Sequence, residues 1–384
     1  MKKTKEIFKN TMVYFFHWCF LYIYDYWLLR EKKLAVPKTM LLIKVDAIGD
    51  YVIFRNFIEC IKNSKKYKDY SITLCGNIIW KDVAEKFDAN FVDEFIWIDK
   101  NNFVSNKKYR KNILNLIRNR GFEIAVQPTY SREFLYGDAI MRASGSRKRI
   151  GNSGDSTNIN RLSKFIFNQF YTDLLIADND TLFEFYRNKE FFEEFLGEKI
   201  LLDKPDFNLP KNTVSKKYAV IMPGTSLLIN RWDSAKYAEI VMYLHKKYDM
   251  RIFIAGGDQD IITAQEIVAR TYAIPIEIVA GKKLDEFIKL VSNASILISN
   301  ETSAVHIGVA TNTPTVCISR GSRFGRFDPY PKKIFNNIAY AYPPEIKNCS
   351  NDFDYLCKAY KNKSNLDINK ITVTEVIDII NGIL

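Results

Sequence analysis

The residues best suited to chemistry follow the first strongly apolar run of the chain. Met40–Asp46 leads into a turn with Gly49 and Asp50, and helical spacing begins at Tyr51. A continuous apolar run of this length is typical of a strand buried on both faces of a parallel sheet. Such sheets bind ligands at the carboxyl ends of their strands, so Asp50 is predicted to face a ligand. An Asp at a helix start is also a good N-cap, and this alternative explains its position without any chemistry.

A second group of polar residues follows another apolar run, Ile296–Ser299. The segment "NETSAVHIGVA" places Glu301, Thr302 and Ser303 at the start of a small-residue helix that contains His306. A helix start presents free N–H groups and a partial positive charge, which suit a diphosphate. We expect the two hydroxyls to bind that group, and Glu301 to bind a sugar or hold the loop. His306 is either a ligand contact or a packed side chain.

Two further loops carry groups of the same kind. The strand Tyr218–Pro223 leads into Gly-Thr-Ser, where Thr225 and Ser226 offer hydroxyls and amides to phosphate oxygens. Arg231, a few residues later, is a candidate for the phosphate charge. Asp258 follows a strand that ends in Gly-Gly, and a carboxylate there accepts hydrogen bonds from ribose hydroxyls. A plain turn and a helix cap are the respective alternatives.

The segments that hold these loops alternate between β-rich runs and helical patterns. The predicted strands are 40–46, 71–75, 91–98, 122–127, 218–223, 251–257, 276–281, 295–299 and 313–319. Repeated βα units predict open parallel sheets, and the pattern restarts after a polar stretch with Pro205 and Pro210. The predicted fold is therefore α/β, with two Rossmann-like, doubly wound domains that face a cleft, and an aromatic helix before them. The predicted divisions are a helical segment (1–36), an N-terminal domain (37–205), a linker (206–217), a C-terminal domain (218–345) and a tail with a helix (346–384).

Composition indicates a folded protein with an anionic partner. Hydrophobic residues make up 47% and charged residues 26% of the 384 residues, and the formal net charge is +12. A charge of this size favours nucleic acid, anionic lipid or a phosphorylated substrate. Nucleic acid is not expected, because no nucleic-acid-binding module is recognisable. The three His and six Cys show no metal-ligand or disulfide spacing, so no metal site is predicted and a reducing, cytoplasmic compartment fits best.

The amino-terminal segment combines lysines with an aromatic run. Thr11–Leu29 is nearly apolar and includes Trp18 and Trp27, although His17 and Asp25 interrupt it. A spanning helix needs about 20 apolar residues, so the run is marginal in length, and no signal-peptide cleavage site follows it. Trp and Tyr prefer the head-group region, so we expect an interfacial helix on an anionic membrane surface. The alternative is a helix that packs on the protein itself or on a partner subunit.

Basic residues gather in two segments. Tyr130–Asp155 carries Arg132, Arg147 and Arg149, and forms either an anion-binding loop or a solvated surface. The second set is Arg320, Arg323 and Arg326. These residues follow the last strand predicted in the C-terminal domain, and we expect them to close over a diphosphate.

The segment "LLIKVDAIGDYVIF" resembles the opening strand, turn and helix of glycosyltransferase family 9, the heptosyltransferase family. "NETSAVH" is similar to that family's Asn-Asp-Ser/Thr-Gly-x-x-His signature, and the motif order agrees from Met40 to Leu384. The resemblance implies two domains in the GT-B arrangement. It also implies inverting transfer of a sugar from a nucleotide diphosphate donor such as ADP-heptose, with heptose as the first candidate for that sugar. Asp50 would be the general base, because a sugar hydroxyl is a poor nucleophile until a carboxylate takes its proton.

By the same resemblance, the first domain binds the acceptor and the second binds the nucleotide-sugar. The implied acceptor contacts are Lys44, Asp46, Arg132, Arg147 and Arg149. The implied donor contacts are Thr225, Ser226, Arg231, Asp258, Glu301, Thr302, Ser303 and His306. The acceptor would be an anionic lipid-linked glycan, such as a lipopolysaccharide core, at the inner face of the cytoplasmic membrane. Neither a metal nor another cofactor is expected.

Four positions depart from the family pattern. Asn230 stands for Lys, Asp233 for Pro, Glu301 for Asp and Ser303 for Gly. The longer carboxylate at Glu301 keeps open a hexosyltransferase of capsule or O-antigen synthesis with another nucleotide-sugar. A third alternative is a catalytically weak, membrane-surface binding protein of the same fold, although Asp50 argues against it.

Overall fold

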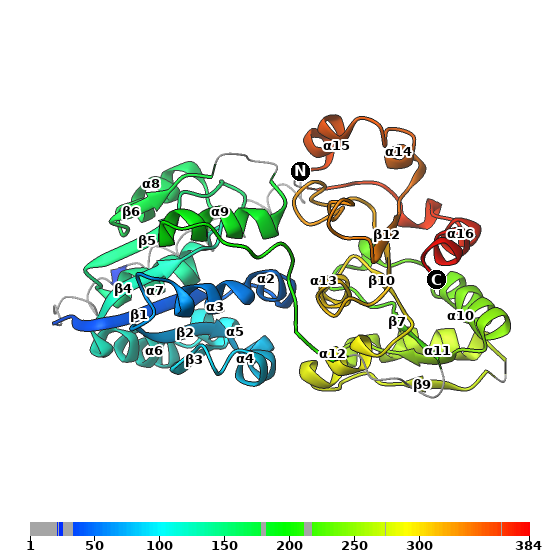
Figure 1. Cartoon of the computed structure of the whole chain (residues 1–384), viewed down its shortest axis with the longest axis horizontal. Helices are drawn as coiled ribbons and strands as arrows, with labels where there is room; N and C mark the ends of the chain where they lie inside the picture. Colours follow the sequence, from blue (N-terminus) through cyan, green and yellow to red (C-terminus); the bar gives the residue numbers. More distant parts are fainter. Residues whose placement is uncertain are drawn as a thin grey trace, which may run out of the picture.

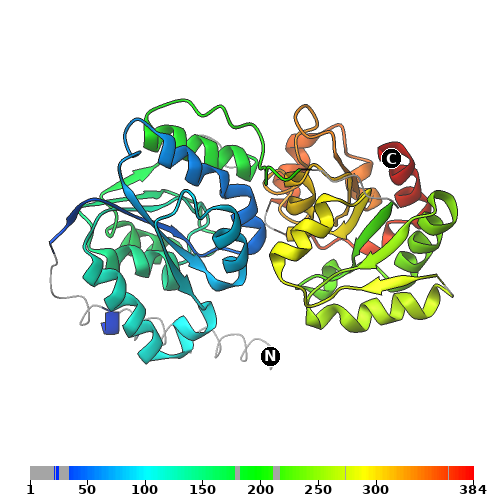
Figure 2. The same cartoon turned by 60° about the horizontal axis from the view of Figure 1, so that its bottom comes forward.

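The computed structural model describes residues 21, 23–25, 34–177, 182–210, 217–272, 274–361 and 363–384. Two six-stranded parallel sheets lie side by side, each in its own domain (Figure 1). Helices cover both faces of each sheet, as the turned view in Figure 2 shows. The predicted α/β fold with two doubly wound domains is therefore confirmed.

The first sheet has the strand order β3-β2-β1-β4-β5-β6. Its strands are β1 (Val36–Lys44), β2 (Ser71–Asn77), β3 (Glu94–Ile98), β4 (Phe122–Gln127), β5 (Lys148–Asn152) and β6 (Asp173–Leu175). The helices of this domain are α2 (Ile48–Phe54), α3 (Asn56–Asn63), α4 (Lys81–Phe87), α5 (Lys100–Ser105), α6 (Lys107–Arg120), α7 (Ala139–Ser144), α8 (Arg161–Asn168) and α9 (Glu184–Leu196).

The second sheet has the order β12-β11-β10-β7-β8-β9. Its strands are β7 (Tyr218–Met222), β8 (Arg251–Ile254), β9 (Ile276–Ile278), β10 (Ile296–Asn300), β11 (Thr315–Ile318) and β12 (Ile338–Ala341). The helices that follow are α10 (Ser234–Tyr248), α11 (Ile261–Arg270), α12 (Leu284–Ser292), α13 (Ser303–Ala310), α14 (Pro344–Lys347), α15 (Phe353–Tyr360) and α16 (Val373–Ile383).

The apolar run in β1 is buried on both faces because successive side chains of a strand point to opposite sides. Leu41 and Ile43 pack in one apolar cluster with residues of α6 and α7. Met40 and Leu42 belong to another cluster, which includes α2, α3 and α9 and continues into α12 and α13 of the second domain. The two domains therefore share an apolar core on the side where α2 meets α13.

The chain that joins the domains is bonded to both of them. Asn56 Nδ2 in α3 donates to the carbonyl of Asp206 at 2.9 Å. The next residue, Phe207, donates its N–H to the carbonyl of Ala310 at the end of α13, at 3.0 Å. This part of the connection thus helps to fix how α2 and α13 lie against each other.

The end of the chain forms part of the second domain. Thr372 caps α16 by accepting a hydrogen bond from the N–H of Glu375 at 3.2 Å. Val376 and Ile380 of α16 are buried in the same apolar cluster as Ile240 of α10 and Val316 of β11. The C-terminal helix therefore covers the second sheet.

Most of the aromatic segment Thr11–Leu29 lies outside the described residues. Within it, Leu21 and Asp25 are buried, and Arg110 Nε of α6 donates to Asp25 Oδ1 at 2.9 Å. These residues thus contact the protein's own first domain, and membrane binding by the rest of the segment stays a prediction. In the described part of the chain, no helix has the length and apolar character needed to cross a membrane.

Candidate active site

Asp50 lies in the first turn of α2, after the loop that follows β1. The N-cap residue of this helix is Ala47, so Asp50 is not the capping residue that the sequence alternative supposed. Within the described ranges its carboxylate has charged neighbours but no hydrogen-bond donor. The side chain is thus held by its helix and left with acceptor capacity for a ligand.

A buried ion pair lies beside Asp50. Lys44 Nζ, at the end of β1, is 2.8 Å from Asp46 Oδ2, and the Lys44 side chain is only 1% exposed. Thr129, which follows β4, donates its hydroxyl to the same carboxylate at 2.6 Å. Burial alone would raise the pKa of Asp46, but the Lys44 charge and these hydrogen bonds lower it. Asp46 is therefore ionised, and the Lys44 ammonium is already paired with it.

This environment changes the proton affinity of Asp50. Burial and the negative charge of Asp46 raise the pKa of Asp50 to about 6, while Lys44 opposes them. A carboxylate with this pKa is mostly ionised at pH 7 and is a stronger base than an exposed Asp. The turn is thus suited to take a proton from a hydroxyl.

The first turn of α13 lies against the turn that carries Asp50. A Cβ atom on Gly49 would lie 2.8 Å from Cδ2 of His306 and 3.6 Å from the Cα of Ser303. A contact of 2.8 Å is closer than carbon atoms approach without repulsion, so only glycine fits here. The predicted base and the predicted diphosphate site are thus brought together across the domain boundary.

The hydroxyls at this helix start have different surroundings. Thr302 is the N-cap residue of α13, and its hydroxyl accepts from the N–H of Ala304 at 3.3 Å. It also lies 3.2 Å from the hydroxyl of Ser299. Ser303 is the first helical residue and is partly exposed. Thr302 therefore shapes the helix start, while Ser303 is available beside Gly49.

His306 is a buried, neutral side chain. Its Nδ1 lies 2.7 Å from the hydroxyl of Tyr330. Burial lowers the pKa of His306 to about 4, so the ring carries no charge near neutral pH. Of the two alternatives from the sequence, packing against Gly49 is what the structure shows, and contact with a ligand stays a prediction.

Glu301 forms part of an acidic pair within the second domain. The hydroxyl of Ser319 lies 2.8 Å from Oε2 of Glu301 and 2.8 Å from Oδ2 of Asp328. Burial and the charge of Asp328 raise the pKa of Glu301 well above its usual range, and burial raises that of Asp328 to about 7. One hydroxyl proton cannot serve both carboxylates, so one carboxyl shares a proton with Ser319. Glu301 thus holds the loop, and its contact with a sugar stays a prediction.

The loop after β7 is shaped by its own hydrogen bonds. The Thr225 hydroxyl donates to the carbonyl of Leu227 at 2.8 Å and accepts from the N–H of Leu227 at 3.1 Å. A Cβ on Gly224 would lie 2.1 Å from Asp260 Oδ2, so glycine is required at this position too. Asn300 Nδ2 at the end of β10 donates to the carbonyl of Pro223 at 2.6 Å. Since β7 and β10 are adjacent, this loop lies next to the start of α13, and the hydroxyl of the exposed Ser226 is at its tip.

Asp258 and Asp260 have separate roles after β8. Asp260 is buried, accepts from the N–H of Gly257 at 3.0 Å and lies 3.4 Å from Arg231 Nη2. Arg231 Nη1 also donates to Thr263 at 2.9 Å. The capping alternative therefore applies to Asp260, and Asp258 is exposed at the carboxyl end of β8. Arg231 is held toward α11, so phosphate binding by it requires a change of partner.

The three arginines predicted to bind the acceptor are not gathered around Asp50. Arg132 is 1% exposed, pairs with Asp138 at 3.5 Å and lies over the ring of Tyr171. Arg147 and Arg149 lie at the amino end of β5, and Arg149 donates to the carbonyl of Phe170. Because the strands are parallel, Arg147 and Arg149 lie at the amino-terminal ends of the strands, whereas Asp50 lies at the carboxyl-terminal ends. An acceptor contact with them would therefore involve a part of the acceptor far from the reacting hydroxyl.

The second set of arginines is also divided. Arg320 is buried and donates to the carbonyl of Ser364, and Arg323 is exposed over the ring of Phe327. Arg326 instead points to the first domain, where it pairs with Glu184. Only Arg323 of the three is thus exposed for a diphosphate.

The sequence did not single out several residues that complete this region. Thr129 supports Asp46, Tyr330 holds His306, and the charge of Glu184 acts on Asp50. Their roles depend on contacts between distant segments, and no local pattern marks them. No group of three or more His, Cys, Asp or Glu side chains that could hold a metal ion occurs among the described residues.

The class of protein is defined by the fold, since two doubly wound domains face each other in the GT-B arrangement. In this chain the turn that carries Asp50 in one domain meets a helix start of the other. Residues 118–358 match the family model of glycosyltransferase family 9 (heptosyltransferase), which is more than half of the chain. The chain belongs to this family. The Gly49–Asp50 turn lies outside the matched residues.

Individual relatives agree with the family. The chain is 28% identical over 107 residues to lipopolysaccharide heptosyltransferase 3 of Escherichia coli, which is 27% of this chain and 32% of that protein. The chain thus matches about a third of the length of this relative. A crystal structure of a family 9 glycosyltransferase from Veillonella parvula has a TM-score of 0.70 at 16% identity, and the match covers 92% of this chain and 98% of that one. E. coli heptosyltransferase WaaC with ADP-2-deoxy-2-fluoro heptose has a TM-score of 0.65 at 16% identity, covering 90% and 99%. At these identities the structures support the fold.

Proposed function

We propose that this chain is an inverting glycosyltransferase that moves a sugar, heptose in the first instance, from a nucleotide diphosphate to a lipopolysaccharide core or another lipid-linked glycan. The observation that carries the proposal is the contact between the Gly49–Asp50 turn and the start of α13. Membership of family 9 supports it, and so does the heptosyltransferase among the relatives.

In the proposed reaction, Asp50 takes the proton of an acceptor hydroxyl as its oxygen attacks the anomeric carbon of the donor. The new bond forms between that oxygen and the anomeric carbon, and the bond from this carbon to the diphosphate oxygen breaks. The raised pKa of Asp50 favours this step, because a base is most effective when its pKa is near the working pH. Asp46 stays ionised beside Lys44 and maintains that pKa.

The departing nucleotide diphosphate carries away the electron pair of the broken bond. The N–H groups at the start of α13 and the hydroxyls of Ser303, Thr302 and Ser226 are proposed to stabilise this charge. The Thr225 hydroxyl would have to leave the carbonyl of Leu227 to join them. Asp258 is proposed to bind the ribose. The neutral His306 keeps the helix start close to Asp50 without adding a charge. No step of this proposal requires a metal ion.

The acceptor is proposed to be anionic and anchored in a membrane, with the enzyme bound peripherally at the inner face of the cytoplasmic membrane. The net charge of +12 supports this location. Arg147 and Lys148, both exposed at the amino end of β5, are suited to lipid phosphates rather than to the reacting hydroxyl.

A different donor is the second candidate. The Glu301 carboxyl shares the Ser319 hydroxyl with Asp328, so the donor-side loop is held by a proton-sharing acidic pair. A sugar other than heptose could suit such a loop, and a hexosyltransferase of capsule or O-antigen synthesis remains the alternative.

A donor panel tests the function. ADP-heptose, UDP-sugars and GDP-sugars are offered with lipid-linked glycan acceptors, and nucleotide release is measured for the wild type and for Asp50→Asn. We expect release with ADP-heptose that depends on the acceptor and on Asp50. Release only with a UDP- or GDP-hexose would select the second candidate. Nucleotide binding without release on any acceptor would favour a binding protein of the same fold.

A further inference from the structure

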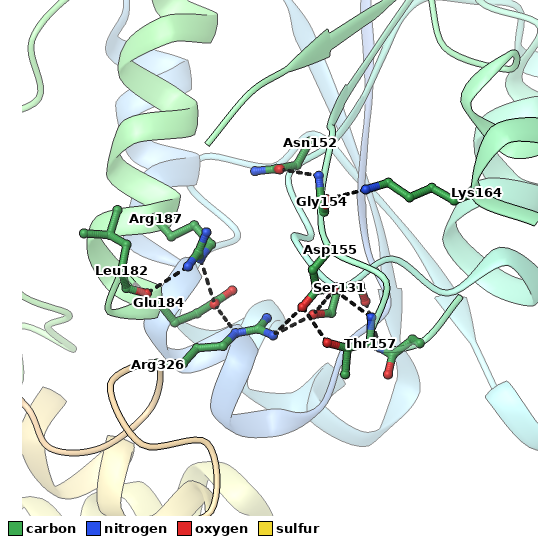
Figure 3. Close-up of polar contacts among 11 residues, drawn as sticks. Ser131, Asn152, Gly154, Asp155, Thr157, Lys164, Leu182, Glu184, Arg187 and Arg326 are labelled. Atoms are coloured by element: carbon green, nitrogen blue, oxygen red, sulfur yellow. Dashed lines mark hydrogen bonds and ion pairs between the residues drawn. The ribbon is translucent and has the colours of Figure 1, made fainter. Parts of the chain in front are cut away.

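Arg326 of the second domain reaches into the first domain. It lies in the loop between β11 and β12, and its Nε donates to Oε2 of Glu184, the first residue of α9, at 2.7 Å. Its Nη1 donates to the hydroxyl of Ser131 at 2.6 Å and lies 3.9 Å from Oδ2 of Asp155 (Figure 3). In addition, the backbone N–H of Glu184 donates to the carbonyl of Arg326 at 2.8 Å. One arginine thus connects the second domain to three segments of the first.

The pair formed by Arg326 and Glu184 is largely removed from solvent. The Glu184 side chain is 3% exposed and that of Arg326 is 15% exposed. The ring of Tyr130 is near two guanidinium groups, with Arg326 at 5.4 Å and Arg187 at 3.6 Å from its centre. Arg187 Nε lies 3.7 Å from the same Oε2 of Glu184, so loss of Arg326 leaves Glu184 with a weaker, more distant partner. A buried pair of this kind resists opening more strongly than an exposed pair.

This contact lies beside the catalytic turn. Helix α9, which begins with Glu184, packs against α2, which carries Asp50. The charges of Glu184 and Arg326 both act on Asp50, and the charge of Glu184 also acts on His306. The loop of Arg326 also contains Tyr330, which bonds His306 in α13. The contact therefore holds together the same two helices whose first turns form the candidate active site.

A second ion pair between the domains offers a comparison. Lys86 of α4 pairs with Asp285 of α12, and these side chains are 32% and 16% exposed. An exposed Lys–carboxylate pair contributes little to stability, because water and salt screen it and its side chains lose freedom. This pair crosses the same boundary, but neither residue is among the main charges that act on Asp50.

We propose that Arg326 and Glu184 are positioning residues for sugar transfer: their pair holds the donor domain so that the start of α13 stays against the turn of Asp50. The proposal rests on the proposed function of Asp50. Neither residue needs to touch the substrates, since both act by fixing the distance between the two catalytic turns. A guanidinium suits this role because it can bond a carboxylate and a hydroxyl at once, whereas a lysine ammonium lacks the fixed fork.

Arg326→Met tests the proposal, with Lys86→Met as the matched control at the other pair. We expect Arg326→Met to lower kcat by about 100-fold, because a misplacement of about 1 Å at a reacting centre has an effect of this size. The affinity for ADP, measured by calorimetry, should change less than about threefold, because the nucleotide site lies within the second domain. The half-point of the kcat–pH profile, about 6 in the wild type, should rise, because the charge of Arg326 lowers the pKa of Asp50 and the variant removes that charge. Lys86→Met should keep kcat within about twofold.

The proposal is overturned if Arg326→Met keeps kcat within threefold of the wild type, or if Lys86→Met loses as much. If Arg326→Met misfolds, Arg326→Lys is used in its place. Circular dichroism then shows whether this variant is folded, and its kcat tests the proposal. A loss greater than threefold in a folded Arg326→Lys supports the proposal, and a smaller loss overturns it. Should the wild type transfer no sugar at all, the proposed function fails, and small-angle scattering still tests the contact. A larger radius of gyration for Arg326→Met than for the wild type and Lys86→Met supports it, and equal radii overturn it.

Discussion

The two strand-end regions that meet at the domain boundary are built from opposite kinds of chemistry. On the first domain, Lys44, Asp46 and Asp50 bring three ionisable groups together, of which Lys44 is buried and the two carboxylates are partly buried. On the second domain, the start of α13 offers hydroxyls, backbone N–H groups and a neutral imidazole. The first region is suited to exchange a proton, and the second to receive a negative charge.

This difference separates two tasks that a single site would perform poorly. A full positive charge next to Asp50 would lower its pKa and weaken it as a base. The start of α13 instead presents partial charges, which stabilise a departing anion and leave the proton affinity of Asp50 high. The full charge of Arg326, which also acts on Asp50, is paired with Glu184. Each prediction below removes one part of this division of labour.

Asp50→Asn should have the largest effect, because it removes the proton acceptor and keeps the shape of the side chain. We expect kcat at pH 7.5 to fall by about 10³-fold, within the range that general bases contribute. The affinity for ADP, measured by calorimetry, should stay within about threefold. Asp258→Asn should show the reverse pattern, with weaker nucleotide binding. Turnover of Asp50→Asn within tenfold of the wild type would remove Asp50 from the mechanism.

Gly49→Ala should separate the two regions without removing an ionisable group. The added Cβ would lie 2.8 Å from Cδ2 of His306, so either the buried His306 ring or α13 itself must move away from α2. We expect kcat to fall by about 10²-fold with an unchanged circular dichroism spectrum. Gly382→Ala is the control, because a Cβ there meets nothing within 4 Å. Equal activity of the two variants would show that the close contact is unimportant.

Asp50→Asn should make the protein more stable at high pH. Most substitutions of a carboxylate have the opposite effect, because they remove a favourable charge. Because the folded pKa of about 6 is above the unfolded value, ionisation of Asp50 destabilises the fold. This cost is absent below about pH 4, grows between pH 4 and 6 and is complete above pH 6. Asp50→Asn should therefore be more stable than the wild type by about 2 kcal/mol at pH 8 and equal to it at pH 4. Denaturation midpoints measure this, and a variant that is less stable at pH 8 would contradict the buried environment of Asp50.

Thr302→Ala should have a smaller effect, on the charge-receiving region alone. Loss of the N-cap costs about 1 kcal/mol of stability and loosens the helix start. We expect about a tenfold loss in kcat/KM with no change in the pH profile. Thr302→Ser keeps the capping hydroxyl and should restore most of the activity. A shifted pH profile in Thr302→Ala would mean that the two regions are not separate.

Arg147→Ala should have the smallest effect on chemistry. Arg147 precedes β5, at the edge of the sheet opposite Asp50. With a soluble acceptor fragment, kcat/KM should stay within about twofold of the wild type, whereas binding to anionic vesicles should weaken. A tenfold loss with the soluble fragment would restore Arg147 as an acceptor contact.

The sequence was most informative where one local pattern determines one element. The apolar run at Met40–Asp46 predicted β1, and nine predicted strands correspond to strands of the structure. The sequence did not reveal β5, because Ile150 is the only large apolar residue among its residues Lys-Arg-Ile-Gly-Asn. It also did not reveal β6, which is an edge strand of three residues. Strand β12 was missed as well, because it follows a long irregular loop that contains Arg326.

The same limit applies to the candidate site. Asp50 and Thr302 were recognisable because a turn or a cap surrounds each of them in the sequence. The pairing of Arg326 with Glu184 was not, because 142 residues separate them and each has an ordinary local context. Arg132 and Arg149 were assigned to the acceptor by the family resemblance, but Arg132 lies in the domain interior and Arg149 at the amino-terminal end of the strands, opposite Asp50.

The pH dependence of a single turnover tests the central claim most directly. Donor and acceptor are mixed with excess enzyme between pH 4.5 and 8, and nucleotide release is followed for the wild type and Asp50→Asn. The account predicts that the wild-type rate rises with pH to a plateau with its half-point at about 6, since Asp50 acts in its ionised form. The residual rate of Asp50→Asn should not depend on pH in this range. A flat wild-type profile, or the same rise in Asp50→Asn, would contradict the assignment of Asp50 as the base.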